Sequence, residues 1–490
     1  MPSSFASGLL DALSRDSRLL GPQLLLILVA TFMLWPLDRL LFARSEKRKW
    51  APLTLGTLVL TGVLLHYTPM GAGFSGMYTV DAFAKGFQWI SLLSAVATVF
   101  LSQGMLNGLK EQTVEYYALI LYSLAGMFFL AGATDFVSAY FSLELMAICI
   151  YILAAYLRTQ DRSIEAGVKY FLLGAFSSGI LLYGISLLFI AGGGQSTSFA
   201  ELGRSIALAS RNHELLVFSG VLMVLVGFAF KVAAVPFHQW SPDAYEGAPT
   251  PITAFMATGP KAAALAVLIR VFGTALHGVA DQWVPALGFI AGASMIWGNV
   301  AAIRQTSMKR LLAYSSIAHV GYMLLGVLSM DVVAGAQVIW LYMAIYLFMN
   351  MGAFAVVIYL QGKGEGERIE DFQGMGRRQP VLAFAMMVFL LSLAGIPPLL
   401  GFFGKFFLFK LAIEQGYVFL TTLALITSAI SAYYYLMVVN QMYFREAPEG
   451  ERAPLGSAIT AIVGAACAVT LIGTAFGPWL MDLVFRIKAI

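Results

Sequence analysis

Four ionisable side chains lie inside long apolar runs of this 490-residue sequence. A charged side chain at the centre of a bilayer costs about 2.5–3.5 kcal/mol, so such residues are usually paired or hydrated and mark the route of an ion. Burial disfavours the charged form of a lysine and a nearby carboxylate favours it, so a change in that contact switches proton binding. We therefore predict a proton-carrying role for Glu144 in FSLELMAICIYIL, Lys231 in LVGFAFKVAAV, Lys261 in MATGPKAAALAVL and Lys405 in LLGFFGKFFLF.

A static role is the alternative for each of these residues. A lysine can extend its amine along apolar surface to water, or it can form an ion pair that never opens. Either arrangement would hold the charge in place without moving a proton.

Prolines adjoin three of the four charged positions. A proline removes a backbone donor and leaves the carbonyl four residues earlier unpaired. Irregular backbone at membrane depth is tolerated where it is buried in protein or lines a hydrated cavity. The sequence therefore predicts broken helices and water beside the three lysines: Pro236 after Lys231, Pro260 before Lys261, and Pro397 with Pro398 before Lys405, which frees the carbonyls of Val232, Met256, Leu393 and Ala394.

Two histidines extend this set of candidate proton carriers. His238 lies seven residues after Lys231, and His319 lies in the run LLAYSSIAHVGYMLLGV. Ser315 precedes His319 by four residues, so both share one helical face and suit a hydrogen-bonded water chain. The alternative is a buried histidine that is bonded to a neighbour and carries no proton.

Other polar residues have simpler interpretations. Asp135 opens an apolar run, which is typical of a negative charge at a helix N-terminus. Asp243 and Glu246 lie in WSPDAYEGAPTP, where turns and caps are an alternative to a role in proton transfer. Cys149 and Cys467 both lie in apolar runs, which does not support a disulfide framework, a zinc site or an iron–sulfur cluster.

The composition excludes a soluble protein. Hydrophobic residues make up 59% of the chain and charged residues 11%, against about 45–50% and 25% in soluble domains. The net charge of +4 is too small for a nucleic-acid-binding surface. No segment requires a strand and no nucleotide-binding fingerprint is present, so we expect an all-α polytopic membrane protein.

Fourteen runs are long enough to cross a hydrocarbon core of about 30 Å, which takes roughly 20 residues at 1.5 Å each. Their expected ranges are 19–42, 51–69, 83–103, 115–133, 136–156, 164–190, 213–236, 251–276, 283–303, 308–329, 333–360, 380–412, 417–444 and 456–485.

Basic residues alternate between the two sets of loops, which predicts orientation because lysine and arginine favour the cytoplasmic side. The poorer set holds Lys85, Arg204 and Arg211, together with both termini, which we place in the periplasm. The N-terminal segment has no clear cleavage signal, so we expect it to be retained. The richer, cytoplasmic set holds Arg44, Lys47, Arg48, Lys49, Lys110, Arg158, Arg162, Lys169, Arg304, Lys309, Arg310, Lys363, Arg368, Arg377, Arg378, Arg445 and Arg452.

A short motif recurs with reversed orientation. GFAFK ends at Lys231 and GFFGK ends at Lys405, in the seventh and twelfth runs. The second copy lies five runs after the first, an odd offset, so it is inverted, as in many transporters. We predict inverted five-helix repeats over spans 4–8 and 9–13, with broken helices 7 and 12. The expected units are 1–114 with three helices, 115–276 and 277–444 as the repeats, and 445–490 as a final helix.

These motifs resemble the antiporter-like membrane subunits of respiratory complex I, the proton-pumping NADH:quinone oxidoreductase, and most of all its N-type subunit. The resemblance covers nearly all the chain. An M-type subunit would have glutamate where this chain has Lys405, and an L-type subunit would end in a long lateral helix. The similarity is carried by the stretch from Gly227 to Ala264, KRLLAYSSIAHVGY at 309–322, YLFMNMGAFAVV at 346–357 and LAGIPPLLGFFGKF at 393–406.

The resemblance implies a proton-translocating subunit of the bacterial inner membrane, with quinone reduction in other subunits as the driving force. It implies that Glu144 pairs with Lys231, that Lys261 connects the two halves and that Lys405 ends the second. It also implies that flavin, iron–sulfur clusters and quinone belong to partner subunits of the respiratory electron-transport chain, so this translocase subunit would hold no cofactor. An M-like subunit is the expected neighbour.

Three other functions remain open at this stage. Multi-subunit sodium/proton antiporters contain members with the same lysine and glutamate pattern. A photosynthetic, ferredoxin-dependent relative of complex I contains a closely similar subunit. The chain could also be an assembly scaffold whose buried charges move no proton.

Overall fold

A computed structural model describes residues 16–34, 50–108, 114–210, 212–362, 364–446 and 457–475, and almost all of them are helical. The helices are α2 (Gly21–Leu34), α4 (Trp50–Tyr67), α5 (Ala82–Gly108), α6 (Val114–Ala131), α7 (Phe136–Ala154), α8 (Asp161–Ala191), α9 (Phe199–Ala209), α10 (Glu214–Val232), α11 (Trp240–Gly247), α12 (Thr250–Arg270), α13 (Ala280–Ile303), α14 (Met308–Val327), α15 (Val332–Gln361), α16 (Met375–Arg378), α17 (Pro380–Ala394), α18 (Leu400–Glu414), α19 (Val418–Phe444) and α20 (Ser457–Ala475).

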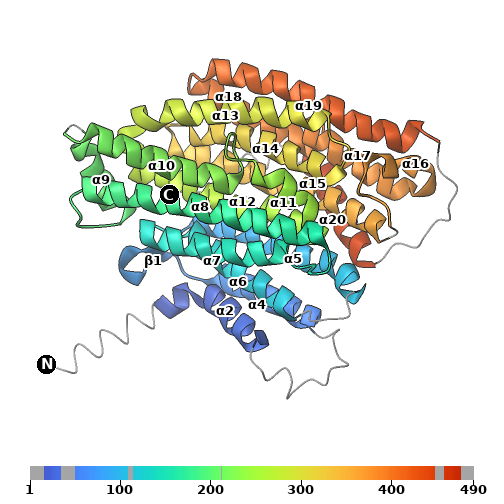
Figure 1. Cartoon of the computed structure of the whole chain (residues 1–490), viewed down its shortest axis with the longest axis horizontal. Helices are drawn as coiled ribbons and strands as arrows, with labels where there is room; N and C mark the ends of the chain where they lie inside the picture. The colour runs from blue at the N-terminus through green and yellow to red at the C-terminus, as the bar shows by residue number, and fades with distance from the viewer. Residues whose placement is uncertain are drawn as a thin grey trace.

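Within the described residues, ten helices are long and apolar enough to cross a membrane, and three shorter apolar helices accompany them. Helices suit this composition because lipid offers no partner to a backbone N–H or C=O, so each helix must satisfy its own. The helices lie side by side in layers, from α2 and α4 at one edge to α18 and α19 at the other (Figure 1). The chain is therefore an integral membrane protein of mainly helical structure.

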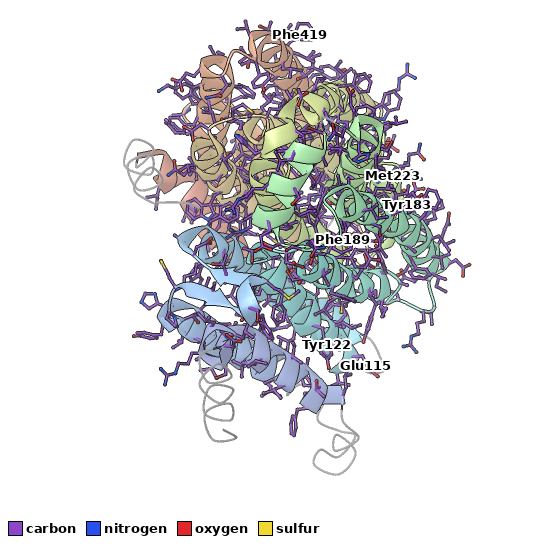
Figure 2. The ribbon with its side chains drawn as sticks, turned by 90° about the vertical axis from the view of Figure 1, so that its left-hand side faces the viewer. Glu115, Tyr122, Tyr183, Phe189, Met223 and Phe419 are labelled. Atoms are coloured by element: carbon purple, nitrogen blue, oxygen red, sulfur yellow. The ribbon has the colours of Figure 1, made fainter. Side chains whose placement is uncertain are left out.

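The apolar residues form both a core and an outer surface. All 21 residues of α12 are buried, because this helix packs against α5, α6, α14 and α15. The outer surface is also apolar, and the side chain of Phe419 on α19 is 80% exposed. Figure 2 shows Phe419 at one end of the molecule and Glu115 and Tyr122 of α6 towards the other. An apolar exterior of this kind suits lipid or neighbouring membrane subunits.

Two of the three predicted interruptions are present. Helix α10 ends at Val232, Ala233 is left-handed at φ 62°, and α11 begins after a cis Val235–Pro236 bond. Helix α17 ends at Ala394, Gly395 is left-handed at φ 84°, and a cis Pro397–Pro398 bond precedes α18. The indole N–H of Trp240 donates to the Phe230 carbonyl at 3.0 Å, which satisfies a group at the first interruption.

The interruption predicted at Pro260 is wrong. Helix α12 continues through this proline from Thr250 to Arg270. The neighbouring backbone N–H of Gly259 donates to the Ser94 hydroxyl of α5 at 3.1 Å, and Ser94 also bonds the Thr258 hydroxyl at 2.7 Å. Polar partners from α5 thus accompany the proline, and the surrounding helices hold α12 in one piece.

Strand structure in the described residues is limited to one short hairpin, a small exception to the all-α prediction. Strands β1 (Gly71–Gly73) and β2 (Tyr78–Val80) pair antiparallel between α4 and α5. Some predictions fall outside the described residues and have no structural outcome here: the two termini and Arg44, Lys47, Arg48, Lys49, Lys110, Arg211, Lys363 and Arg452.

Candidate functional site

Lys231 and Glu144 form an ion pair between α10 and α7. The Lys231 amine lies 3.4 Å from a Glu144 carboxylate oxygen, in the last turn of α10 before the interruption. The lysine also donates to the hydroxyls of Ser178 at 3.0 Å and Tyr151 at 3.2 Å. Ser178 donates to the same carboxylate. The serine therefore bridges the pair and gives a proton a second path between them.

The two members of this pair differ in exposure. The Lys231 side chain is 3% exposed and that of Glu144 is 21% exposed. Glu144 thus lies at the edge of the bundle, although it is within an apolar helix. A charge beyond the surface of the chain can therefore reach Glu144 more directly than it can reach Lys231.

Lys261 lies deep in α12 and has a hydroxyl partner. Its amine donates to the Ser316 hydroxyl of α14 at 2.5 Å and lies 5.5 Å from the centre of the Tyr245 ring. Among the described residues, no carboxylate lies within ion-pair distance of this lysine. A buried amine with a hydroxyl partner can gain or lose a proton without breaking an ion pair.

His319 is hydrogen-bonded between two tyrosines. Its Nδ1 lies 2.6 Å from the Tyr342 hydroxyl and its Nε2 lies 3.5 Å from the Tyr435 hydroxyl. The Ser315 hydroxyl bonds the same Tyr435 hydroxyl. Ser315 and His319 thus share one face as predicted, and Tyr435 of α19 joins them.

Lys405 lies in the second turn of α18, after the other interruption. Its amine donates to the Ala394 carbonyl at 2.9 Å and to the Ser428 hydroxyl at 2.8 Å, and it lies 5.1 Å from the centre of the Tyr322 ring. Ala394 is one of the carbonyls that the prolines were expected to free. The Ala394 carbonyl therefore accepts a hydrogen bond from Lys405, the lysine that follows the two prolines.

A hydrogen-bonded amide group lies beside this region. The Asn299 amide donates to the Tyr322 hydroxyl at 3.0 Å, and its carbonyl accepts from the Tyr434 hydroxyl at 3.1 Å. Tyr322 also contacts the His319 ring edge-on, with centroids 5.8 Å apart. Tyr322 thus lies beside both His319 and Lys405.

Sequence reasoning missed the hydroxyl groups that connect the charged residues. They are Tyr151, Ser178, Ser316, Tyr342, Ser428 and Tyr435, and each bonds a predicted residue directly. Serine and tyrosine are common in apolar helices, so their identity carries little signal. Only their pairing with a charged residue on another helix distinguishes them.

His238 stands apart from these bonds. It lies in the turn between α10 and α11, its Nδ1 is buried without a hydrogen-bond partner, and its ring contacts Trp297 edge-on at 6.3 Å. No hydrogen bond joins it to Lys231 within the described part of the chain. Its role in the proton path stays a prediction.

The remaining acidic candidates have clear partners. Asp135 accepts from the backbone N–H groups of Val137 and Ser138, so the prediction of a charge at a helix N-terminus is confirmed. Asp243 and Glu246 form ion pairs with Arg310 at 2.8 and 3.0 Å. Burial raises the pKa of Asp243, but bonds from Arg310 and Lys169 outweigh it and hold that pKa below its usual value.

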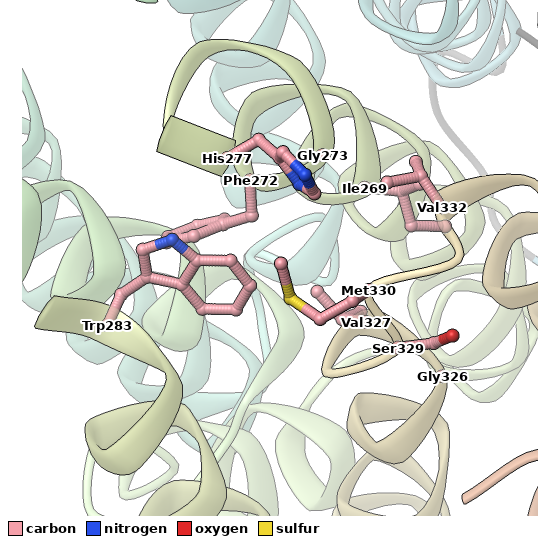
Figure 3. Close-up of a pocket in the computed structure, with 10 residues that line it drawn as sticks. All are labelled: Ile269, Phe272, Gly273, His277, Trp283, Gly326, Val327, Ser329, Met330 and Val332. Carbon is pink, nitrogen blue, oxygen red and sulfur yellow. The ribbon is translucent and has the colours of Figure 1, made fainter. Parts of the chain in front are cut away.

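A small cavity of about 10 Å³ lies beside the C-terminal end of α12 (Figure 3). It is lined by residues that include His277, Trp283 and Ser329 and has room for about one water molecule. None of the predicted proton carriers lines it. The described residues also contain no cluster of histidine, cysteine and carboxylate groups suited to a metal ion.

Comparison with known proteins places this chain in a family. Residues 133–431 match the family model for the transmembrane region of NADH:quinone oxidoreductase and Mrp antiporters. NADH-quinone oxidoreductase subunit N of Granulibacter bethesdensis is 44% identical over 86% of this chain and 88% of its own length. A chain of respiratory complex I from Thermus thermophilus has a TM-score of 0.77 and 32% identity, with 96% of this chain and 99% of that one covered.

A chain of the Mrp complex from a Dietzia species has the same TM-score, 0.77, at 19% identity, with 96% of this chain and 95% of that one covered. At that identity the likeness shows the fold alone. The same fold thus occurs in two kinds of membrane complex, and the higher identities lie with the oxidoreductase.

Proposed function

Since this chain belongs to the family of antiporter-like membrane subunits of NADH:quinone oxidoreductase, with its similarity to N-type subunits, we propose that it moves protons across the membrane within respiratory complex I. The observation that carries this function is the series of buried ionisable groups from Glu144 to Lys405. Hydroxyl groups contact each of them.

The Glu144–Lys231 pair is the switch in this scheme. Quinone reduction in other subunits rearranges charge, and the pair opens and closes in response. Breaking one ion-pair contact at an effective dielectric near 20 changes the energy by several kcal/mol. Moving a unit charge against 100 mV costs about 2.3 kcal/mol. One opened pair therefore supplies enough energy to move one proton.

The proton then passes from Lys231 through Lys261 and His319 towards Lys405. Lys261 bonds a hydroxyl at 2.5 Å, and His319 has a tyrosine hydroxyl at each ring nitrogen. Such groups can donate and accept in turn. Ser315 and His238 are the further members of the path, and release is to the periplasm.

The chain contributes to the enzyme as a translocase subunit without redox chemistry of its own. In this scheme flavin, iron–sulfur clusters and quinone are held by partner subunits. Its two cysteines, Cys149 and Cys467, are free in the structure, and both lie within apolar helices.

The scheme requires a defined topology. We propose fourteen spans, with inverted repeats over residues 115–276 and 277–444 between a three-helix unit at 1–114 and a final helix at 445–490. Both termini face the periplasm of a bacterial inner membrane. The paired interruptions after α10 and α17 support the repeat, because in each a helix ends at a left-handed residue and a proline follows.

Neighbouring membrane-arm subunits are the proposed partners. Glu144 lies at the edge of the bundle, where lipid would be a poor environment for a carboxylate. A polar group of an adjacent subunit, which the resemblance suggests is M-like, would satisfy it. Contact at this edge would couple the switch to charge movement in the neighbour.

The test compares proton pumping with NADH oxidation in membrane vesicles that contain the assembled complex. Lys231→Met removes the switch lysine, so we expect pumping per electron to fall about tenfold or more. Lys410→Met is the control, because Lys410 is over half exposed and pairs with Glu414 one turn away. Unchanged pumping in Lys231→Met at equal assembly would refute the scheme.

The sodium/proton antiporter is the second candidate, favoured only by the shared fold. Replacing sodium in the medium separates the two. Transport that depends on sodium and not on NADH would favour the antiporter, whereas transport driven by NADH without sodium favours the oxidoreductase. Oxidation of ferredoxin in place of NADH would indicate the photosynthetic relative.

A further inference from the structure

One buried lysine has no part in the path described above. Lys309 lies in the first turn of α14 and is 7% exposed. Its amine donates to the Ala248 carbonyl at 2.8 Å. The sequence placed it in a basic loop, but the structure buries it between α14 and the segment that joins α11 to α12.

We propose that Lys309 takes up protons from a surface pocket and passes them to Lys261. This inference rests on the proposed function, because it supplies the proton that the path then carries. It assigns a proton-transfer step to Lys309, which the sequence alone had placed in a loop.

The pocket is polar and lies directly beside Lys309. It encloses about 230 Å³, and its lining residues are Arg162, Glu165, Ala166, Lys169, Asp243, Glu246 and Gly247. Gly247 immediately precedes Ala248, whose carbonyl accepts a hydrogen bond from the Lys309 amine. Arg310, the next residue after Lys309, bonds both Asp243 and Glu246. The lysine therefore lies behind the inner wall of the pocket.

The charges in the pocket favour proton exchange over binding of an ion. The charged lining residues are two cations, Arg162 and Lys169, and three carboxylates, Glu165, Asp243 and Glu246. Arg310 balances the third carboxylate, and Glu165 and Asp243 both bond Lys169. Arg162 pairs with Glu367, outside the lining, at 3.5 Å, so each of these charged side chains already has a partner and none is left to hold an added ion. Water that fills the pocket can still bring protons to its inner wall.

Two buried hydroxyl groups of α11 lie near Lys261. The Tyr245 hydroxyl and the Ser241 hydroxyl of α11 are buried and have no well-formed hydrogen bond. Tyr245 lies beside Lys261 at 5.5 Å and near Ser316. Buried polar atoms without a partner commonly mark the positions of ordered water. Water at these hydroxyls would connect the two lysines.

The spacing on α14 suits this connection. Ser316, the partner of Lys261, lies seven residues after Lys309, which is about two turns or roughly 10 Å along the helix. Residues seven apart lie on nearly the same face of a helix. Lys309 and Ser316 therefore border the same side of α14, towards α11 and α12, on which Ala248 and Lys261 lie.

The transfer balances without any other reactant. The Lys309 ammonium gives a proton to water at the Tyr245 hydroxyl, and that water gives a proton to the neutral Lys261 amine. One N–H bond breaks and one forms. The neutral Lys309 amine then takes a proton from a hydronium ion in the pocket, which leaves a water molecule and restores the starting state.

A structural role for Lys309 is the competing explanation, since it also satisfies the Ala248 carbonyl. Two variants in the assembled complex separate the two roles. Lys309→Met removes the donor and the charge. Lys309→Arg keeps both, but arginine does not release its proton in a protein. We expect proton pumping to fall about a hundredfold in both variants, at the lower end of the range for loss of a positioned acid or base. Restoration by arginine would overturn the proposal.

The pH on the pocket side gives a second readout. In vesicles with the pocket side outwards, uptake limits turnover in Lys309→Met, so we expect a lower external pH to restore pumping. A purely structural defect would not respond in this way, and a defect that persists at every external pH would overturn the proposal. Lys410→Met serves as the unaffected control.

Lys231→Met in the same vesicles distinguishes failure of the uptake proposal from failure of the proposed function. If Lys231→Met lowers pumping and Lys309→Met does not, protons reach Lys261 by another route and only the uptake proposal is refuted. If neither variant lowers pumping, the proposed function of the path is refuted with it.

Discussion

The two interruptions of the bundle share one backbone design but surround their lysines differently. Each has a helix that ends in a left-handed residue, then a cis proline and a further helix. Lys231 precedes its interruption and has a carboxylate partner at 3.4 Å. Lys405 follows its interruption and has a carbonyl and a hydroxyl as partners.

Under the proposed function, this difference divides the steps of proton transfer between the halves. A lysine beside a carboxylate holds its proton until the carboxylate moves, whereas a buried lysine with neutral partners gives its proton up more readily. Glu144 is also the more exposed member of its pair. The first interruption is therefore suited to receive a signal, and the second to release a proton.

The largest expected effect comes from removing the carboxylate that only the first half has. Glu144→Ala leaves Lys231 buried without its counter-ion, and breaking a buried pair in this way costs about 3–5 kcal/mol. We expect poor assembly of the complex, measured by the amount of intact complex in the membrane. The double variant Glu144→Ala/Lys231→Met should recover assembly but not pumping. Normal assembly of Glu144→Ala would remove the contrast between the halves.

A smaller effect is expected from hydroxyl partners of the two lysines. Ser428→Ala removes one of two acceptors from Lys405, and leaving a buried donor short of a partner costs about 1–3 kcal/mol. Ser178→Ala should cost less, because Lys231 keeps Glu144 and Tyr151. Thermal stability of the purified complex tests this order. Equal losses of thermal stability in the two variants would show that Ser428 and Ser178 contribute equally.

Variants of the two tyrosines that bond His319 test whether this histidine connects the two halves. Tyr435→Phe and Tyr342→Phe each remove one hydroxyl and keep the ring, so stability should fall by about 0.5–1.5 kcal/mol. Pumping should fall more in Tyr342→Phe, because that hydroxyl lies 2.6 Å from the histidine and the other lies 3.5 Å away. The ratio of protons pumped to NADH oxidised measures this. The reverse order would move the main path to Tyr435.

The smallest expected effect on stability comes from the surface ion pairs, which serve as a comparison for the buried Glu144–Lys231 pair. The pKa of Asp243 is held below its usual value by Arg310 and Lys169, so its contribution is present at neutral pH and is lost as the pH falls through that lowered pKa. Asp243→Asn should therefore reduce stability at pH 7 by about 1 kcal/mol or less, and the difference from the native chain should persist at pH 5. Melting curves at both values test this. A difference that vanished by pH 5 would contradict it.

Much of this molecule was predictable from residue types and spacing. Apolar runs of membrane length predicted the helices, because lipid leaves a chain no other way to satisfy its backbone over that length. Prolines predicted the interruptions after α10 and α17, because proline removes a donor whatever its surroundings. The rarity of charge in such runs made Glu144, Lys231, Lys261 and Lys405 stand out.

Other features required the packing of distant segments. Helix α12 continues through Pro260, and it packs there against Ser94 of α5, which lies 164 residues before its partner Thr258 in the sequence. The bridging role of Ser178 depends on α8 packing against both α7 and α10. The burial of Lys309 depends on α14 packing against α11, which the basic character of the surrounding loop concealed.

The sequence by itself determined which groups can carry a proton and that they lie within a membrane, because both follow from residue type and local hydropathy. The tertiary structure alone decided which lysine has a carboxylate and which has neutral partners. The reason is that an ion pair depends on the distance between atoms on different helices, and that distance is set only when the helices pack.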